Sequence, residues 1–168
     1  MISTKEMRLA AIADIMDASR TGGQIWSNGY KFINGTPTKG NIMGDLTKNF
    51  NRSEYACRGL DCCGHSAVIV PLLYNGVQEL RALVGVPLTI NSGFRCNKHN
   101  AATRDASKFS RHTTGEAADI LCPSHLDVDH FAMCAEKIHA FRRGGIGRYD
   151  NRIHVDVRKT GPARWDNR

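Results

Sequence analysis

Several features that would place a protein in a membrane or in an export pathway are missing from this sequence. No uninterrupted apolar run approaches the about 20 residues that a membrane-spanning helix needs. The first residues, Met-Ile-Ser-Thr-Lys-Glu-Met-Arg, lack the apolar core of a signal peptide. We therefore expect a chain without a membrane span, which is made in the cytoplasm and carries no export signal of its own.

The sequence also lacks internal repeats, low-complexity segments and any recognisable nucleic-acid-binding motif. Its net charge of +7 indicates an affinity for polyanions, but the basic residues are scattered. They are densest at Arg142-Arg143 and between Arg158 and Arg168. Charge alone does not separate nucleic acid from anionic cell-wall polymers, and without a motif we expect no nucleic-acid partner.

What the sequence does have is the composition of one folded domain. Its 168 residues are 41% hydrophobic and 23% charged, which is ordinary for a globular protein with a hydrophobic core. We expect a monomer. Residues 1–45 are interpreted as a helix-and-loop extension that packs on the domain, and residues 46–168 as the domain itself.

Apolar periodicity and turn residues predict an α+β fold. The clearest helix begins at Pro71 and ends before Gly85, and Ser124 is the expected N-cap of a later helix. A short hairpin is expected around Ile25 to Ile33, followed by a loop. Helices are predicted at 4–19, 71–84, 97–102 and 124–142, and strands at 87–92, 116–122, 145–149 and 152–158. This order fits a single domain with a central antiparallel sheet flanked by helices.

Two short segments concentrate side chains that can bind a metal ion. Residues 110–119 read SRHTTGEAAD and contain His112 and Asp119, whereas residues 153–157 read IHVDV and contain His154. Two imidazoles and one carboxylate are what a catalytic zinc ion takes from a protein, with a fourth position left for water. We therefore predict one Zn²⁺ ion bound by these three side chains.

Asp156 is the first candidate for a catalytic base. On a strand, residues two apart share a face, so Asp156 should point the same way as His154. It could act as general base, or it could orient the imidazole of a metal ligand. A salt bridge to Arg158 or Arg152 is the alternative without a catalytic role. Asp150 is the second candidate for the base.

A second group of soft ligands lies upstream, where Cys57, Cys62, Cys63 and His65 follow one another closely. These side chains could bind a second, structural zinc ion. Against this, adjacent cysteines rarely both bind one tetrahedral ion, and free thiols or disulfides are the alternatives. Cys96 could form a disulfide with one of this group.

The same residues resemble a known family, the zinc peptidases of the D-alanyl-D-alanine carboxypeptidase and L-alanyl-D-glutamate peptidase type. Their fold is shared with the hedgehog signalling domain. The resemblance rests on SxHxxGxAxD at 110–119, SGFR at 92–95 and HxD at 154–156. A fainter match at 50–55 extends it, so that it covers roughly 46–165.

This resemblance implies a hydrolase of amide bonds in bacterial peptidoglycan stem peptides, either a carboxypeptidase or an endopeptidase, with one catalytic zinc ion. It also implies that Arg95 binds a substrate carboxylate, for which a guanidinium fork is suited. Ser92 and Ser110, in the same motifs, are expected to form hydrogen bonds next to the substrate. Several members are phage endolysins, so we expect an enzyme of cell lysis that acts on the host cell wall after its release.

One departure from the family affects the catalytic base. Many relatives have an acid or base two or three residues before the last ligand histidine, where this chain has Arg152 and Asn151. An alternative is therefore a hedgehog-like module, which binds a metal ion and a cell-wall or protein partner without turnover.

Overall fold

The computed structural model describes residues 30–33, 36–39 and 44–168, and the chain forms two compact units, Met1–Ile42 and Met43–Arg168. In the first unit, β1 (Tyr30–Ile33) pairs with β2 (Thr36–Lys39) in an antiparallel hairpin. The second strand thus lies where the sequence predicted a loop. The predicted helix at 4–19 lies outside the described residues, and the packing of 1–45 on the domain stays a prediction.

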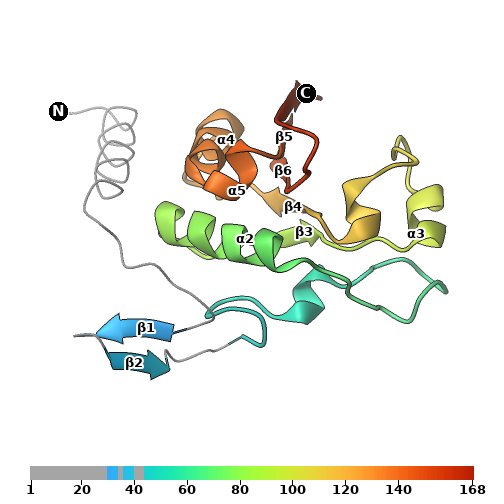
Figure 1. Cartoon of the computed structure of the whole chain (residues 1–168). Helices are drawn as coiled ribbons and strands as arrows, with labels where there is room; N and C mark the ends of the chain where they lie inside the picture. Colours follow the sequence, from blue (N-terminus) through green and yellow to red (C-terminus); the bar gives the residue numbers. More distant parts are fainter. Residues whose placement is uncertain (1–29, 34–35, 40–43) are drawn as a thin grey trace. The chain divides into compact units, whose positions relative to one another are not determined.

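The second unit is built on a five-stranded sheet with the order β3-β4-β6-β5-β7 (Figure 1). Its neighbours are antiparallel except for β5 and β7, which run parallel. The strands are β3 (Ile90–Ser92), β4 (Ala117–Leu121), β5 (Gly145–Tyr149), β6 (Arg152–Asp156) and β7 (Ala163–Asp166). The hairpin of β5 and β6 was predicted. β7 was not, because its alternation in ARWD covers only four residues of a polar C-terminal segment, too few to stand out as a strand.

The predicted helix at 71–84 is confirmed as α2 (Pro71–Val84), which ends at Gly85 in the left-handed conformation. Leu73, Val77 and Leu80 on its inner face are fully buried. Leu72 was expected on the same face, but it is 55% exposed. The short α3 (Asn97–Ala102) also occupies the predicted range.

The helix predicted from Ser124 to Arg142 is wrong in its start and in its continuity. Its first part is α4 (Val128–Lys137). The N-cap is Asp127, three residues after the expected Ser124, because the carboxylate of Asp127 accepts the hydrogen bond from the backbone of His130. Ile138 then adopts an extended backbone, with φ −80° and ψ 119°, and α5 (His139–Arg142) follows. The break places both Ile138 and Phe141 in the core.

The two faces of the sheet have different environments. One face packs against α2, α4 and α5 and buries apolar residues of the central strands (Figure 1). These core residues are Ala118, Ile120, Ile146, Ile153 and Val155. The residues between them point to the opposite face because side chains alternate along a strand. Within the described residues, no helix has the length and apolarity to cross a membrane.

Candidate metal centre

One transverse row of residues crosses the sheet and forms the floor of the site. Asp119 on β4 is paired with His154 on β6, which is paired with Gly147 on β5, which is paired with Trp165 on β7. Residues in register on neighbouring strands project from the same face. The sheet therefore brings a carboxylate, an imidazole and an indole together from positions far apart in the sequence.

His112 reaches this row from a short 3-10 helix, η2 (Arg111–Thr114). Ser110 caps the helix by accepting a hydrogen bond from the backbone of His112, and Gly115 ends it with φ 70°. The side chain is buried, and its Nδ1 lies 2.6 Å from the carbonyl oxygen of Gly93. A carbonyl only accepts, so Nδ1 donates and Nε2 presents its lone pair to the site.

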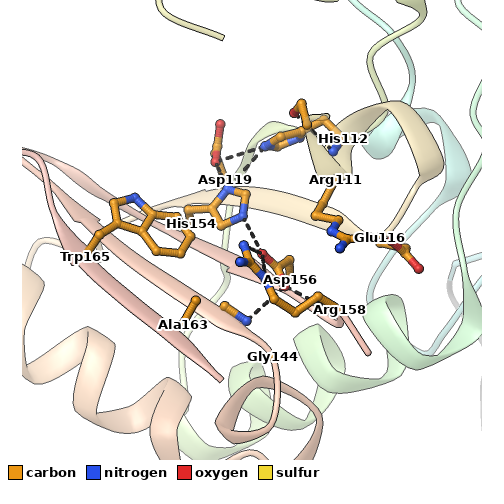
Figure 2. A network of polar contacts seen from close by, with 12 residues as sticks. Arg111, His112, Glu116, Asp119, Gly144, His154, Asp156, Arg158, Ala163 and Trp165 are labelled. Atoms are coloured by element: carbon orange, nitrogen blue, oxygen red, sulfur yellow. Dashed lines mark hydrogen bonds and ion pairs between the residues drawn. The ribbon is translucent and has the colours of Figure 1, made fainter. Parts of the chain in front are cut away.

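The three predicted ligands converge on one point (Figure 2). His112 Nε2 lies 3.3 Å from His154 Nδ1 and 3.3 Å from Asp119 Oδ1, and His154 Nδ1 lies 2.9 Å from the same carboxylate oxygen. A tetrahedral zinc ion with nitrogen and oxygen ligands at about 2.0–2.2 Å sets those atoms about 3.3–3.6 Å apart. Two of the three separations match this range, and the third, between His154 Nδ1 and Asp119 Oδ1, is slightly shorter. A small adjustment of these two side chains therefore fits a zinc ion without rearrangement of the strands.

The hydrogen bonds behind the ligands fix the protonation of both imidazoles. His154 Nε2 lies 3.2 Å from the carboxylate of Asp156, so Nε2 donates and Nδ1 faces Asp119 and His112. Two imidazole lone pairs and a carboxylate around one point repel each other unless a cation, either a proton or a metal ion, lies between them. This set of donors is the strongest structural sign of a metal centre.

The pKa values of the three predicted ligands also indicate that the site favours a cation. Burial lowers the pKa of His112 below its ordinary value, although the contact with Asp119 opposes this effect. Burial alone would raise the pKa of Asp119, but hydrogen bonds from His112 and His154 hold it far below its usual range. Burial would lower the pKa of His154, but hydrogen bonds to Asp119 and Asp156 raise it instead. Asp119 thus stays ionised and attracts a cation.

Asp156 lies behind His154 and is completely enclosed. Its oxygens accept hydrogen bonds from the backbone of Gly145, at 2.9 Å, and from the backbone and guanidinium of Arg158, at 2.5–3.0 Å. A Cβ on Gly145 would lie 2.3 Å from Asp156 Oδ2, so glycine is needed there. Burial would raise the pKa of Asp156, but the contacts with His154 and Arg158 lower it. This environment favours the role of orienting His154 over that of a base.

Asp150, the second candidate for the base, is exposed in the turn between β5 and β6. It lies four positions before His154, so the two side chains are at most roughly 13 Å of chain apart, and unlike Asp156 it makes no hydrogen bond with His154. The two candidates therefore differ sharply in their environment, and the identity of the base stays a prediction.

Arg95 lies at the edge of the metal centre, where its backbone N–H donates to the carbonyl of His112. Its side chain is half-buried, and its buried Nε has no partner among the residues that the structure describes. Burial lowers the pKa of Arg95, while the charge of Asp119 and the hydroxyl of Tyr149 oppose this effect. The positive charge of nearby Arg152 lowers it further. An anionic group would match this pair of guanidinium groups.

Sequence reasoning missed the aromatic wall of the site. The ring of Trp165 is tilted against that of His154 with centroids 5.1 Å apart, and its indole N–H donates to the hydroxyl of Tyr149, 3.3 Å away. Arg152 lies over the ring of Tyr149, 4.4 Å from its centroid. A Cβ on Gly147 would meet the indole of Trp165 at 2.3 Å, so glycine makes room for the ring. The sequence feature that could have indicated this wall is Trp165 itself, a single tryptophan in a polar C-terminal segment.

The remaining predicted residues divide into two groups. Ser92 is paired with Asp119 across β3 and β4, and Ser110 caps the helix of His112, so both lie next to the metal centre. The upstream cysteines instead gather with Cys96 in a separate cluster. His65 does not join them, because its Nδ1 contacts the backbone carbonyl of Cys57.

Comparison with known proteins agrees with this geometry. No curated protein matches the chain. A family model described as Peptidase M15 matches residues 48–156, which is more than half of the chain and includes all three ligands, Arg95 and Asp156. The metal centre therefore lies in the part of the chain that the family shares, and we conclude that this protein belongs to the Peptidase M15 family of hydrolases.

Proposed function

We propose that this protein is a zinc metallopeptidase that hydrolyses amide bonds in bacterial peptidoglycan stem peptides. The observation that supports it most directly is the convergence of His112 Nε2, His154 Nδ1 and Asp119 Oδ1 around one point, with the lone pairs of both imidazoles turned inward. When bound there, zinc supplies a Lewis acid that polarises the scissile carbonyl and activates water.

The protein residues around this point hold and orient the reactants. The carbonyl of Gly93 fixes His112, and Asp156 fixes His154, so that both imidazoles keep the tautomer that a metal ion requires. Trp165 packs against the ring of His154 and helps to fix its orientation. Asp156 is itself anchored by Arg158, so that the orienting carboxylate cannot swing away.

Arg95 and Arg152 support a substrate that carries a carboxylate. The buried Nε atoms of both side chains lack a partner in the described part of the chain. A guanidinium group pairs with a carboxylate through two parallel hydrogen bonds, which fixes both its position and its orientation. Peptidoglycan stem peptides carry such carboxylates, and the net charge of +7 favours an anionic cell-wall surface.

Within this class, we assign the protein to cell lysis by a bacteriophage, as an endolysin that works as a monomer on the host cell wall after release from the cytoplasm. The support is the basic surface charge, together with the motif resemblance to endolysins. The competing function is a metal-binding module without turnover. The enclosure of Asp156 favours that alternative, because an enclosed carboxylate does not reach a water molecule in the site.

Digestion of purified peptidoglycan, followed by mass spectrometry of the released fragments, tests the proposal and identifies the bond that is cut. We expect new fragments with wild type and none after chelation or with His154→Ala. His125→Ala is the matched control, because His125 is exposed and lies outside the site. Intact peptidoglycan after incubation with the zinc-loaded wild type would leave the binding module as the function.

A further inference from the structure

A second cluster of metal-binding side chains lies outside the metal centre. It consists of four thiols whose sulfur atoms all lie within 4.8 Å of one another, those of Cys57, Cys62, Cys63 and Cys96. Cys57 is buried and the other three are half-buried. The sulfur of Cys62 lies 3.6 Å from that of Cys57 and 3.8 Å from that of Cys63.

These separations match a metal ion bound by four thiolates. Sulfur ligands at about 2.3 Å from a tetrahedral zinc ion lie about 3.8 Å apart. A disulfide requires a sulfur–sulfur distance of about 2.05 Å and joins sulfurs only in pairs, whereas four sulfurs here gather around one point. We propose that Cys57, Cys62, Cys63 and Cys96 bind a structural zinc ion.

The backbone of this region is shaped to turn two adjacent cysteines toward the same point. Asp61 and His65 have positive φ values, 46° and 58°, although neither is glycine, and Gly64 has φ 62°. Such conformations cost free energy, and they persist where the surroundings fix them. The bend allows Cys62 and Cys63 to present both sulfurs, which an extended chain would point in opposite directions.

Two backbone N–H groups point to sulfurs of the cluster, as N–H groups do at thiolate ligands. The N–H of Cys96 points to the sulfur of Cys57 at 3.5 Å, and the N–H of His99 points to the sulfur of Cys96 at 3.4 Å. The ring of His99 also contacts the sulfur of Cys57, at 3.3 Å. Hydrogen bonds of this kind fix and stabilise the first ligands of a metal ion.

The zinc ion links the irregular loop between η1 (Arg52–Tyr55) and α2 to the segment that supports the metal centre. Cys96 follows Arg95 directly, and the N–H of Phe94 donates to the carbonyl of Tyr55 at 2.8 Å. The same segment supplies the carbonyl of Gly93 that orients His112. Binding of zinc to the four cysteines therefore holds Arg95 and Gly93 in place.

The experiment measures zinc content and zinc ligands in the full-length chain, purified under reducing conditions. The first variant, His154→Ala, removes the metal centre described above. We expect it to retain one zinc ion per chain, with X-ray absorption showing sulfur ligands only. The double variant Cys57→Ser/Cys96→Ser should retain only a zinc ion with nitrogen and oxygen ligands. Cys122→Ser/Cys134→Ser is the matched control and should retain both zinc ions.

A second measurement covers the case in which the cysteine variant fails to fold. Hydrogen exchange of His154→Ala, which holds zinc only in the cysteine cluster, is followed before and after zinc removal, and we expect faster exchange in residues 57–66 and 93–97. A folded His154→Ala protein without sulfur-bound zinc would overturn the proposal, as would disulfides among these four cysteines in zinc-supplemented protein purified without a reductant. Neither outcome bears on the peptidase proposal, which is tested by peptidoglycan digestion.

Discussion

Asp119 and His154 lie directly opposite each other in the register of β4 and β6, and their side chains meet at 2.9 Å. This contact joins two motifs whose contacting residues are 35 positions apart in the sequence. Both residues lie on central strands of the sheet, so the backbone hydrogen bonds that hold the fold also hold their side chains in place. Substitution of a side chain leaves these backbone bonds intact. Mutations in the site should therefore affect metal binding before they affect the backbone.

The first prediction is that His154→Ala removes the zinc ion with nitrogen and oxygen ligands. Loss of one of three protein ligands leaves only His112 and Asp119, which is too few for a tight site. Elemental analysis should show one zinc ion fewer per chain than in wild type, with an unchanged far-ultraviolet circular dichroism spectrum. An unchanged zinc content would exclude His154 from the site.

The second prediction separates the two roles of Asp156. If it orients His154, Asp156→Asn should weaken zinc binding about 10–100-fold, as loss of such a supporting group does. If it is the general base, zinc affinity should stay near wild type while turnover falls by roughly two to four orders of magnitude. From its enclosure we expect the first result. Competition with a chromogenic chelator provides the affinity.

Asp150→Asn is the matched control for that experiment, because it makes the same change in an exposed turn of the same hairpin. We expect zinc affinity and turnover close to wild type. A variant at Asp150 that binds zinc normally and turns over nothing would instead identify Asp150 as the base.

The third prediction concerns Arg95. Arg95→Lys keeps the positive charge but loses the two parallel hydrogen bonds to a carboxylate. A hydrogen bond to a charged group contributes about 1.5–3 kcal/mol, so we expect kcat/KM to fall about 10–150-fold while zinc content stays constant. Arg104→Lys is the control, because the side chain of Arg104 is 95% exposed. Equal kinetics of the two variants would show that Arg95 is structural.

The fourth prediction tests the corrected start of α4. Asp127→Ala should lower the free energy of unfolding by about 1 kcal/mol at pH 7, whereas Ser124→Ala should change little. The backbone hydrogen bond from His130 lowers the pKa of Asp127, with the His130 side chain adding to this effect. The stabilisation is therefore present above the ordinary carboxyl pKa of about 3.9, and is lost as the pH falls through the lowered pKa.

Urea unfolding at pH 7 and near pH 2.5 measures this difference. The difference in the free energy of unfolding between wild type and Asp127→Ala should be smaller at the lower pH. In contrast, Asp127→Asn retains a cap that does not titrate. The difference in the free energy of unfolding between Asp127→Asn and Asp127→Ala should therefore be the same at both pH values. A gap between wild type and Asp127→Ala that does not change with pH would show that the carboxylate charge adds nothing to the cap.

The sequence predicted those parts of the molecule in which local signals agree with the tertiary structure. Pro71 and Gly85 mark the ends of α2, and apolar spacing identifies its inner face. The β5–β6 hairpin and the three ligands were predicted for the same reason, since each lies in a short segment with a strong pattern. Asp156 was placed on the face of His154 by strand alternation alone.

The remaining features depend on contacts between distant segments. β7 is an edge strand of four residues, and its position beside β5 depends on Trp165 packing over Gly147. The break at Ile138 follows from the burial of Ile138 and Phe141, which a helix pattern does not show. Cys96 joins the cysteine cluster through the fold, because it lies more than thirty residues from the other three in the sequence.

The alternation of side chains along β6 restricts the positions at which residues can be inserted or deleted. An insertion or deletion of one residue inside β6 would turn Ile153 and Val155 toward the metal centre and place His154 and Asp156 in the core. Such a change would remove the ligand and separate two already buried polar groups from their hydrogen-bond partners in the same step. Length variation in this hairpin is therefore restricted to the exposed turn at Asp150-Asn151, where added residues leave the alternation of both strands intact.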